Sequence, residues 1–245
     1  MTSNLEGLYA APGNGDVAGP RRALVVAAHP DDADFGAAGT AYLWSRQGWE
    51  FYYLVCTDGS KGSDDPALAP HQLVELRREE QRQAARFLGV KDVYFLDYVD
   101  GELVHGRDLL GDVVRVVRAV KPHAVFTHDP ESVIVGDAFV NHSDHRVTGL
   151  VAIDAVYPAA RDRLNFPEQI AAGLQPHKVN EVYIWGSERS NFDVDITDAL
   201  QTKIDALLLH RSQFAGDDLI RRIMERWRNH DGRYVESFRR VQMAF

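Results

Sequence analysis

Short apolar runs alternate with longer amphipathic segments along most of this chain. The runs have the length and the β-branched or aromatic content of buried strands, and they cover residues 23–28, 51–57, 93–96, 124–127 and 181–185. Between them, apolar side chains recur at helical spacing over residues 35–44, 71–88, 108–120 and 144–157. Strands that alternate with helices in this way favour a parallel sheet with right-handed crossovers. The pattern therefore predicts an α/β fold with a mostly parallel sheet flanked by helices.

The two ends of the chain depart from this alternation. Near the C-terminus we expect a short strand over residues 192–196 and two helices, over 197–211 and 216–229, as additions to the sheet. Residues 1–21 are rich in Gly, Pro and Asn and have no apolar period, which predicts a flexible N-terminal arm. No linker interrupts the remainder, so residues 22–245 are predicted to form a single domain.

Two clusters of His and Asp follow predicted strands. The run His29-Pro30-Asp31-Asp32 ends the first strand, and Asn141-His142-Ser143-Asp144-His145 follows the fourth after a loop. Binding sites in open α/β sheets lie at the carboxyl ends of the strands. Imidazole nitrogens and carboxylate oxygens suit zinc, and three protein ligands with one open position are typical of catalytic zinc. The clusters therefore predict a metal site with two ligands from the first run and one from the second.

Composition limits the other classes of function. The chain has 245 residues, 27 Lys and Arg, and 36 Asp and Glu, so its net charge of −9 disfavours nucleic-acid and anionic-membrane partners. The pattern G-x-G-x-x-G is absent, and the spacing around Lys61 is wrong for a P-loop, which disfavours dinucleotide and nucleotide sites. A single cysteine, Cys56, in an apolar run favours a reducing compartment, and we expect a cytoplasmic protein.

Further short motifs accompany the two clusters. In chain order the whole set is Ala28-His29-Pro30-Asp31-Asp32, Thr57-Asp58-Gly59, Arg77-Arg78-Glu79-Glu80, Phe95-Leu96 with Asp100-Gly101, Thr127-His128-Asp129-Pro130 and His142-Ser143-Asp144-His145. In these motifs the chain resembles the PIG-L / LmbE-like family of zinc-dependent N-deacetylases. The resemblance implies a Rossmann-like sheet. It also implies hydrolysis of an N-acyl, most simply N-acetyl, amide on a small molecule such as an N-acetylglucosamine conjugate or an acylated natural product.

The resemblance also implies which residues bind the metal and which residue acts as the general base. His29, Asp32 and His145 fall at the positions of the zinc ligands, for one Zn²⁺ per chain. Asp31 falls at the position of the general base. Family members range from monomers to trimers and hexamers, so a homo-oligomer is an open expectation.

Four more residues receive roles from the resemblance. His142 is implied as the group that protonates the leaving amine or steadies the oxyanion, and Asp144 as the residue that orients it. Arg77 and Asp100 fall where the family contacts substrate. Simpler alternatives are that His142 or Asp144 only caps a helix, and that Arg77 is a solvated helix charge.

Three positions depart from the family pattern. Ala33 stands where many members have Glu, with Asp34 one place further on, and Ser143 replaces the usual Pro. Val140 lies where mycothiol-type members have a Tyr that polarises the carbonyl. Without that Tyr, His142 must carry more of the oxyanion stabilisation, or another donor must come from a loop.

Two alternative functions remain open at the level of the sequence. A phosphoesterase on a similar sheet would also place acids at strand ends, although such enzymes usually use more carboxylates or two metals. A non-catalytic binding or assembly protein could retain the clusters as a vestigial site. Amine release, phosphate release and metal content distinguish these possibilities.

Overall fold

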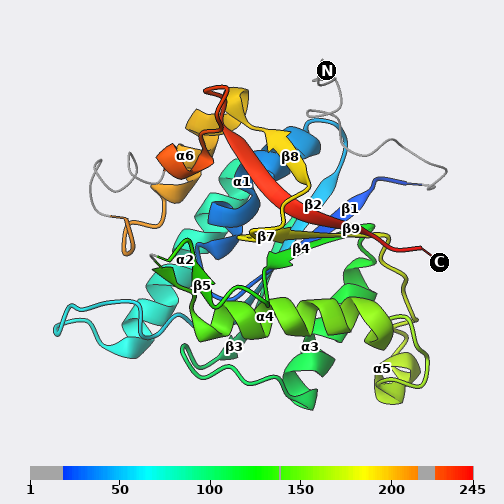
Figure 1. The fold of residues 1–245 in the computed structure, drawn as a ribbon. Coiled ribbons are helices and arrows are strands. Elements are labelled where there is room, and N and C mark those ends of the chain that lie inside the picture. Colours follow the sequence, from blue (N-terminus) through cyan, green and yellow to red (C-terminus); the bar gives the residue numbers. More distant parts are fainter. Residues whose placement is uncertain (1–18, 138, 215–223, 245) are drawn as a thin grey trace.

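A seven-stranded sheet forms the centre of the computed structural model, which describes residues 19–137, 139–214 and 224–244 (Figure 1). Its strands, in the spatial order β3-β2-β1-β4-β7-β9-β8, are β1 (Arg22–Ala27), β2 (Glu50–Thr57), β3 (Asp92–Tyr98), β4 (Ala124–His128), β7 (Glu181–Trp185), β8 (Phe192–Asp195) and β9 (Val235–Gln242). Neighbouring strands from β3 to β7 are parallel, whereas β9 runs antiparallel to both β7 and β8. The predicted α/β fold with a mostly parallel sheet is confirmed.

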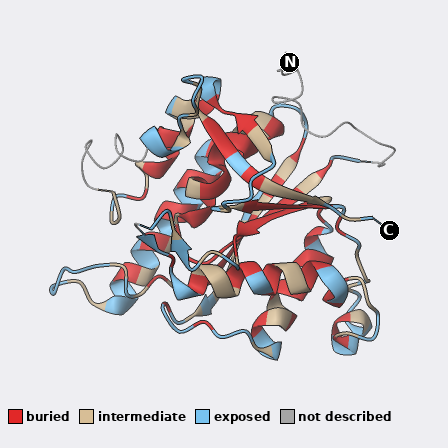
Figure 2. Ribbon diagram, viewed as in Figure 1, coloured by how far each residue is buried: buried red, intermediate tan, exposed pale blue. Residues whose placement is uncertain are grey.

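Helices cover both faces of this sheet. They are α1 (Asp32–Ser45), α2 (Pro70–Leu88), α3 (Arg107–Val120), α4 (Ser143–Asp154), α5 (Pro167–Ala171) and α6 (Leu200–Leu207). Helices α1, α2 and α6 pack together on one face, and α3 and α4 lie on the other (Figure 1). Helices cover both faces because successive side chains of a strand point to opposite faces, and both faces of β1 are apolar. Val25 belongs to the core under α1, and its neighbour Val26 belongs to the core under α3 and α4. Figure 2 shows these two buried layers on either side of the sheet.

The strand order brings the two His/Asp clusters to one place. Strands β1 and β4 are hydrogen-bonded neighbours in parallel register, with Val26 opposite Thr127. β1 leads directly into α1, and β4 leads to α4 through a hairpin of β5 (Ile134–Val135) and β6 (Phe139–Val140). Both clusters therefore follow the carboxyl ends of adjacent strands, where the topology opens a site.

Several elements differ from the sequence-based prediction. Helix α1 begins at Asp32 rather than at residue 35, so the first acidic cluster is part of its first turn. The loop predicted between residues 129 and 141 contains the β5–β6 hairpin, and β9 has no counterpart in the prediction. The helix predicted over 197–211 is a 3₁₀ turn followed by α6, which ends at Leu207.

Two predictions fall largely outside the described residues. The N-terminal arm lies mostly within residues 1–18, and the helix predicted over 216–229 lies partly within residues 215–223. Residues 224–227 of that helix are described, and they are helical. None of the helices in the described ranges is long and apolar enough to cross a membrane.

A buried ion pair fastens α1 to the C-terminal additions. Lys203 in α6 donates to Glu236 in β9, and Glu236 also accepts hydrogen bonds from the backbone N–H groups of Gly39 (2.9 Å) and Thr40 (2.8 Å). The side chains of Lys203 and Glu236 are 0% and 1% exposed, and burial lowers the pKa of Lys203 while Glu236 opposes that shift. The pair therefore holds the helix that carries the first ligand cluster.

We expect Lys203→Met to lower the free energy of unfolding by about 3–5 kcal/mol, because it leaves the Glu236 charge buried without its partner. Urea unfolding followed by circular dichroism measures this loss. Gln201→Met on the exposed side of the same helix is the control and should change stability by less than about 0.5 kcal/mol. An equal effect of both variants would contradict the role assigned to the ion pair.

Candidate metal centre and active site

The first His/Asp cluster forms the turn between β1 and α1. Asp32 begins the helix, and its Oδ2 atom accepts a hydrogen bond of 2.7 Å from the backbone N–H of His29. The same oxygen lies 3.1 Å from His29 Nδ1. Between them Asp31 has a φ of 109°, which residues other than glycine rarely adopt and which persists only where surrounding contacts hold it. The turn thus sets two predicted ligands side by side.

The second cluster supplies the third predicted ligand. His142 immediately precedes α4, and its Nδ1 atom accepts a hydrogen bond of 3.2 Å from the backbone N–H of Asp144. His145 lies in the first turn of this helix, and its Nε2 atom is 3.2 Å from Asp32 Oδ1. Ligand atoms of His29, Asp32 and His145 all lie within 4.8 Å of one another. The structure therefore brings together all three predicted zinc ligands.

A second group shares His29, because Asp100, His142 and Asp144 also offer atoms within 4.8 Å of it. The carboxylates of this group already accept backbone hydrogen bonds, Asp144 from Gly101 and Leu103 and Asp100 from Lys61. They lie 3.1 Å (Asp100) and 3.3 Å (Asp144) from His29 Nε2, on the opposite side of the ring from Asp32. This is how carboxylates orient a metal-bound imidazole through its other nitrogen.

A cavity of about 360 Å³ lies beside the first group, and we call it the metal cavity. The polar side chains that line it are those of Asp31, Asp32, His128, Asp129, Asn141, His145 and Arg226, and the apolar ones are those of Phe35, Val135, Phe139 and Trp185. Asp100 and Asp144 are not part of this lining. Catalytic zinc needs a ligand position that faces a substrate cavity. Asp32 and His145 line this cavity, and His29 contacts Asp32 without being part of the lining. The two imidazoles and one carboxylate of the first group therefore fit a catalytic zinc ion in donor type, and two of them give it access to the cavity.

Electrostatics at His29 agree with a cation site. Burial alone would lower the pKa of His29, but the carboxylates of Asp100, Asp144 and Asp32 raise it to about 12. Metal binding displaces a proton from an imidazole, so a position that favours positive charge this strongly also favours a metal ion.

Asp31 lies beside the ligands and pairs with a buried arginine. Arg77 Nη2 donates to the Pro30 carbonyl (2.8 Å) and to Asp31 Oδ2 (3.3 Å), and Arg77 Nη1 donates to the Gly59 carbonyl (3.0 Å). Burial and the neighbouring Asp32 charge raise the pKa of Asp31 to about 6, although Arg77 acts in the opposite direction. A carboxyl group in this range is suited to accept a proton near neutral pH.

The four remaining predicted residues all lie in or next to this site. Arg77 is 4% exposed, so its alternative interpretation as a solvated helix charge is wrong. Asp144 does not cap its own helix, because the cap residue is His142. The Asp144 carboxylate is 4.0 Å from His142 Nδ1, further than from His29 Nε2, and its backbone N–H makes the bond to His142. Arg77 and Asp100 form ion pairs with Asp31 and His29 respectively, and their role in substrate binding stays a prediction.

Comparison with known proteins identifies the family. Residues 24–156, more than half of the chain, match the family described as "PIG-L: GlcNAc-PI de-N-acetylase". The chain belongs to this family. The diacetylchitobiose deacetylase of Thermococcus kodakarensis is 36% identical over 197 residues, which cover 80% of this chain and 72% of the relative. This PIG-L protein is therefore a member of a group of amidohydrolases that remove N-acetyl groups.

Solved structures agree with this assignment. The N,N'-diacetylchitobiose deacetylase of Pyrococcus horikoshii superposes with a TM-score of 0.83 at 33% identity, covering 91% of this chain and 84% of the other. The 4-carboxy-2-hydroxymuconate hydratase GalB of Pseudomonas putida has a TM-score of 0.73 at 23% identity, covering 92% of this chain and 98% of the other. The second likeness concerns the fold alone, and it shows that the reaction must be argued from the site.

Two departures from the PIG-L pattern can be located. Val140, where the resemblance places the Tyr of mycothiol-type members, lies in β6 with 74% of its surface exposed, and no tyrosine is among the described residues that line the metal cavity. Asp34, which follows Ala33, is fully buried and accepts hydrogen bonds from Gln81 Nε2 (2.8 Å) and His210 Nε2 (2.8 Å). Its contacts within this PIG-L protein are therefore with α2 and the segment after α6.

Sequence reasoning missed three residues of the site. His128 at the end of β4 stacks on His145 with ring centroids 4.2 Å apart, and its Nε2 atom lies 3.4 Å from Asp32 Oδ2. Asn141 Oδ1 lies 3.0 Å from His145 Nδ1, which fixes the other nitrogen of that imidazole. Gln81 in α2 accepts the backbone N–H of Asp31 at 2.8 Å. The position of His128 at the end of the strand next to β1 was the available signal.

We expect Gln81→Leu to reduce kcat about ten- to hundredfold while leaving the metal content unchanged, because it removes the acceptor that holds Asp31 in its unusual backbone conformation. Steady-state amine release and elemental analysis measure the two quantities. Gln83→Leu is the control, because Gln83 lies on the exposed side of α2 and its side chain donates to Glu79 of the same helix. Equal kcat values for the two variants would contradict this role for Gln81.

Proposed function

We propose that this protein is a zinc-dependent N-deacetylase that hydrolyses the acetamide of an N-acetylglucosamine-containing small molecule, releasing the amine and acetate. One observation carries the proposal: ligand atoms of His29, Asp32 and His145 lie within 4.8 Å of one another, and two of these residues, Asp32 and His145, line a cavity that Asp31 also lines. The PIG-L family match and the named activity of the Thermococcus kodakarensis and Pyrococcus horikoshii relatives support the choice of an acetamido sugar.

His29, Asp32 and His145 would hold the zinc ion, and Asp100 and Asp144 would orient His29 through its other ring nitrogen. When bound, such an ion supplies Lewis-acid chemistry, which polarises a carbonyl group and acidifies water. The mechanism needs, in addition, a base for the attacking water, a donor for the oxyanion and a proton for the leaving amine.

The chain's own residues can meet these three needs. Asp31 accepts the proton of the attacking water, and Arg77 holds that carboxylate in place. His142 accepts the Asp144 backbone N–H at Nδ1, so its neutral ring carries the proton on Nε2 and can donate a hydrogen bond to the developing oxyanion. Asp31 then returns its proton to the amine, which leaves as the C–N bond breaks.

The test measures metal content and reaction type on the same samples. We expect about one zinc per chain and amine release from N-acetylglucosamine or its conjugates. A chelator should remove the zinc and abolish amine release, and added zinc should restore the two together. Phosphate release from p-nitrophenyl phosphate without amine release would favour the phosphoesterase instead. A purified protein that takes up no metal, even on reconstitution, would favour the binding or assembly protein. Assembly into a trimer or hexamer stays a prediction.

A further inference from the structure

A series of buried hydrogen bonds connects the turn at Asp31 to the segment that follows α6. The backbone N–H of Asp31 donates to Gln81 Oε1 (2.8 Å), and Gln81 Nε2 donates to Asp34 Oδ2 (2.8 Å). His210 Nε2 lies 2.8 Å from the same Asp34 oxygen and donates to it, because an ionised carboxylate only accepts. We call Asp34, Gln81 and His210 the buried network, since all three are fully buried.

The network decides which end of the Gln81 amide faces Asp31. In the reversed amide, Nε2 would point at the Asp31 N–H, donor against donor, and Oε1 would point at the Asp34 carboxylate, acceptor against acceptor. The carboxylate therefore selects the orientation that leaves Oε1 for the Asp31 N–H. This bond matters because Asp31 has a φ of 109°, a conformation that persists only where neighbouring contacts hold it.

His210 holds the Asp34 carboxylate in the orientation that Gln81 needs. Both donors, His210 Nε2 and Gln81 Nε2, bind the same oxygen, Oδ2 of Asp34. Without His210 the buried carboxylate would keep only the Gln81 donor of these two, and it would turn more easily about its Cβ–Cγ bond. The imidazole of His210 therefore acts on Asp31 through two intermediate side chains.

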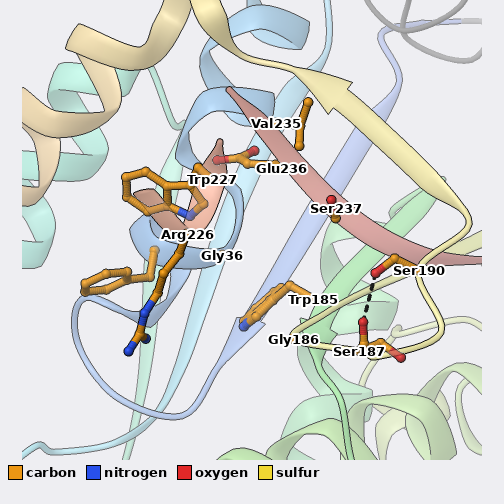
Figure 3. Close-up of a pocket in the computed structure, with 11 residues that line it drawn as sticks. Gly36, Trp185, Gly186, Ser187, Ser190, Arg226, Trp227, Val235, Glu236 and Ser237 are labelled. Carbon is orange, nitrogen blue, oxygen red and sulfur yellow. Dashed lines mark hydrogen bonds between the residues drawn. The ribbon is translucent and has the colours of Figure 1, made fainter. Parts of the chain in front are cut away.

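Other contacts hold α1 itself in place. Glu236 accepts hydrogen bonds from two backbone N–H groups of α1. The Trp185 indole lies against Gly36, where a Cβ atom would come within 2.5 Å of the ring. Gly36, Trp185 and Glu236 line the cavity drawn in Figure 3, and His210 is not part of that lining. The position of α1 is thus fixed by contacts other than those of His210.

The segment after α6 is also attached by residues other than His210. Ser212 donates to the Glu80 carboxylate from its backbone N–H (2.9 Å) and from Oγ (2.6 Å), and Gln213 Nε2 donates to the Gly62 carbonyl (3.0 Å). Ser212 therefore attaches this segment to α2 through the residue next to Gln81. It provides a control that loosens the same contact between elements and leaves the buried network intact.

We propose that His210 is a positioning residue that acts on Asp31. It holds the Asp34 carboxylate, which orients the Gln81 amide, and Gln81 in turn holds the backbone of Asp31. The inference rests on the proposed function, in which Asp31 is the general base. It extends the active site to a segment that supplies neither a metal ligand nor a reacting group.

The first experiment compares amine release from N-acetylglucosamine by three variants. His210→Phe removes the donor and should lower kcat about tenfold, with KM and zinc content unchanged. His210→Gln returns an N–H donor and should recover most of this loss. Ser212→Ala should stay within about twofold of the wild type. An unchanged kcat in His210→Phe, or an equal loss in both His210 variants, would overturn the proposal.

A double variant separates positioning from a general effect on stability. If His210 acts through Gln81, adding His210→Phe to protein that already carries Gln81→Leu should lower kcat by less than about twofold further. Independent effects would multiply instead and give about a tenfold further loss. That outcome would refute the path through Gln81.

Hydrogen exchange of the Asp31 N–H tests the network without a substrate. Measured by NMR, this exchange should be about tenfold or more faster in His210→Phe than in the wild type. The Thr57 N–H, which donates to the Ala28 carbonyl (2.8 Å), is the internal control and should exchange at the same rate in both proteins. If the wild type releases no amine, the deacetylase function fails, and this measurement still decides whether His210 holds Asp31. Equal exchange at Asp31 in both proteins would refute the role of His210.

Discussion

Asp31→Asn is expected to reduce amine release by about 10²–10⁴-fold while the protein keeps its metal, because the substitution removes the base and none of the ligands. Asparagine has nearly the same shape, tolerates a positive φ and can still accept the hydrogen bond from Arg77. The loss should therefore appear in kcat and not in zinc stoichiometry. Steady-state kinetics and elemental analysis on one preparation test both statements.

Asp97→Asn is a closely matched control for this variant. Asp97 also has a positive φ, of 58°, and its carboxylate also pairs with an arginine, Arg78, but it lies at the exposed end of β3. We expect its activity to stay within about twofold of the wild type. Loss of zinc along with activity in Asp31→Asn would contradict the separation of base from ligands.

The metal ligands could be predicted because the fold makes them local features of strand ends. The apolar run over residues 23–28 predicts β1, and His29 and Asp32 directly follow this strand. The turn between β1 and α1 brings the two side chains together within one short segment. Meeting His145 needs β1 and β4 to be neighbours, as they are in the strand order of the Rossmann-like sheet that the family resemblance implies. The prediction of the site thus depends on the order of the strands and little on side-chain packing.

The supporting residues could not be predicted in the same way, because their roles depend on packing between distant elements. Gln81 is one polar residue among many in α2, and only the docking of that helix on the turn before α1 brings its side chain to the Asp31 N–H. His128 becomes part of the site because its ring stacks on His145, across the loop and hairpin that separate them in the chain. Sequence spacing carries no signal for the Gln81 contact, and for His128 the signal was its position at the end of β4 and not its contact with His145.

Strand β9 was missed for a related reason. A strand with one buried face alternates apolar and polar residues, but Glu236 occupies a buried position in β9. Its charge is stabilised by Lys203 from α6 and by two N–H groups of α1, which the sequence does not place nearby. The buried Glu236 breaks the alternating pattern by which β9 could have been predicted, and its hydrogen bonds attach β9 to α1, the helix that bears the first ligand cluster.

The second large effect is expected for His145→Ala, which should lose both the metal and the activity. Two candidate ligand groups share His29, one with Asp32 and His145 and the other with Asp100, His142 and Asp144. If the first group binds the ion, removing one of its three ligands should reduce bound zinc from about one per chain to a small fraction. Amine release should fall by about a thousandfold or more.

His142→Ala and His105→Ala complete this comparison. His142→Ala should keep its zinc and lose activity, because His142 lies beside His29, offers a hydrogen bond from Nε2 and is not a ligand in the first group. His105 is exposed and pairs with Asp154 away from the site, so His105→Ala should match the wild type in both measurements. Zinc retained in His145→Ala but lost in His142→Ala would assign the ion to the second group. The carboxylates of Asp100 and Asp144 would then be ligands, and Asp32 would be left to orient His29 through the backbone and ring contacts that it makes now.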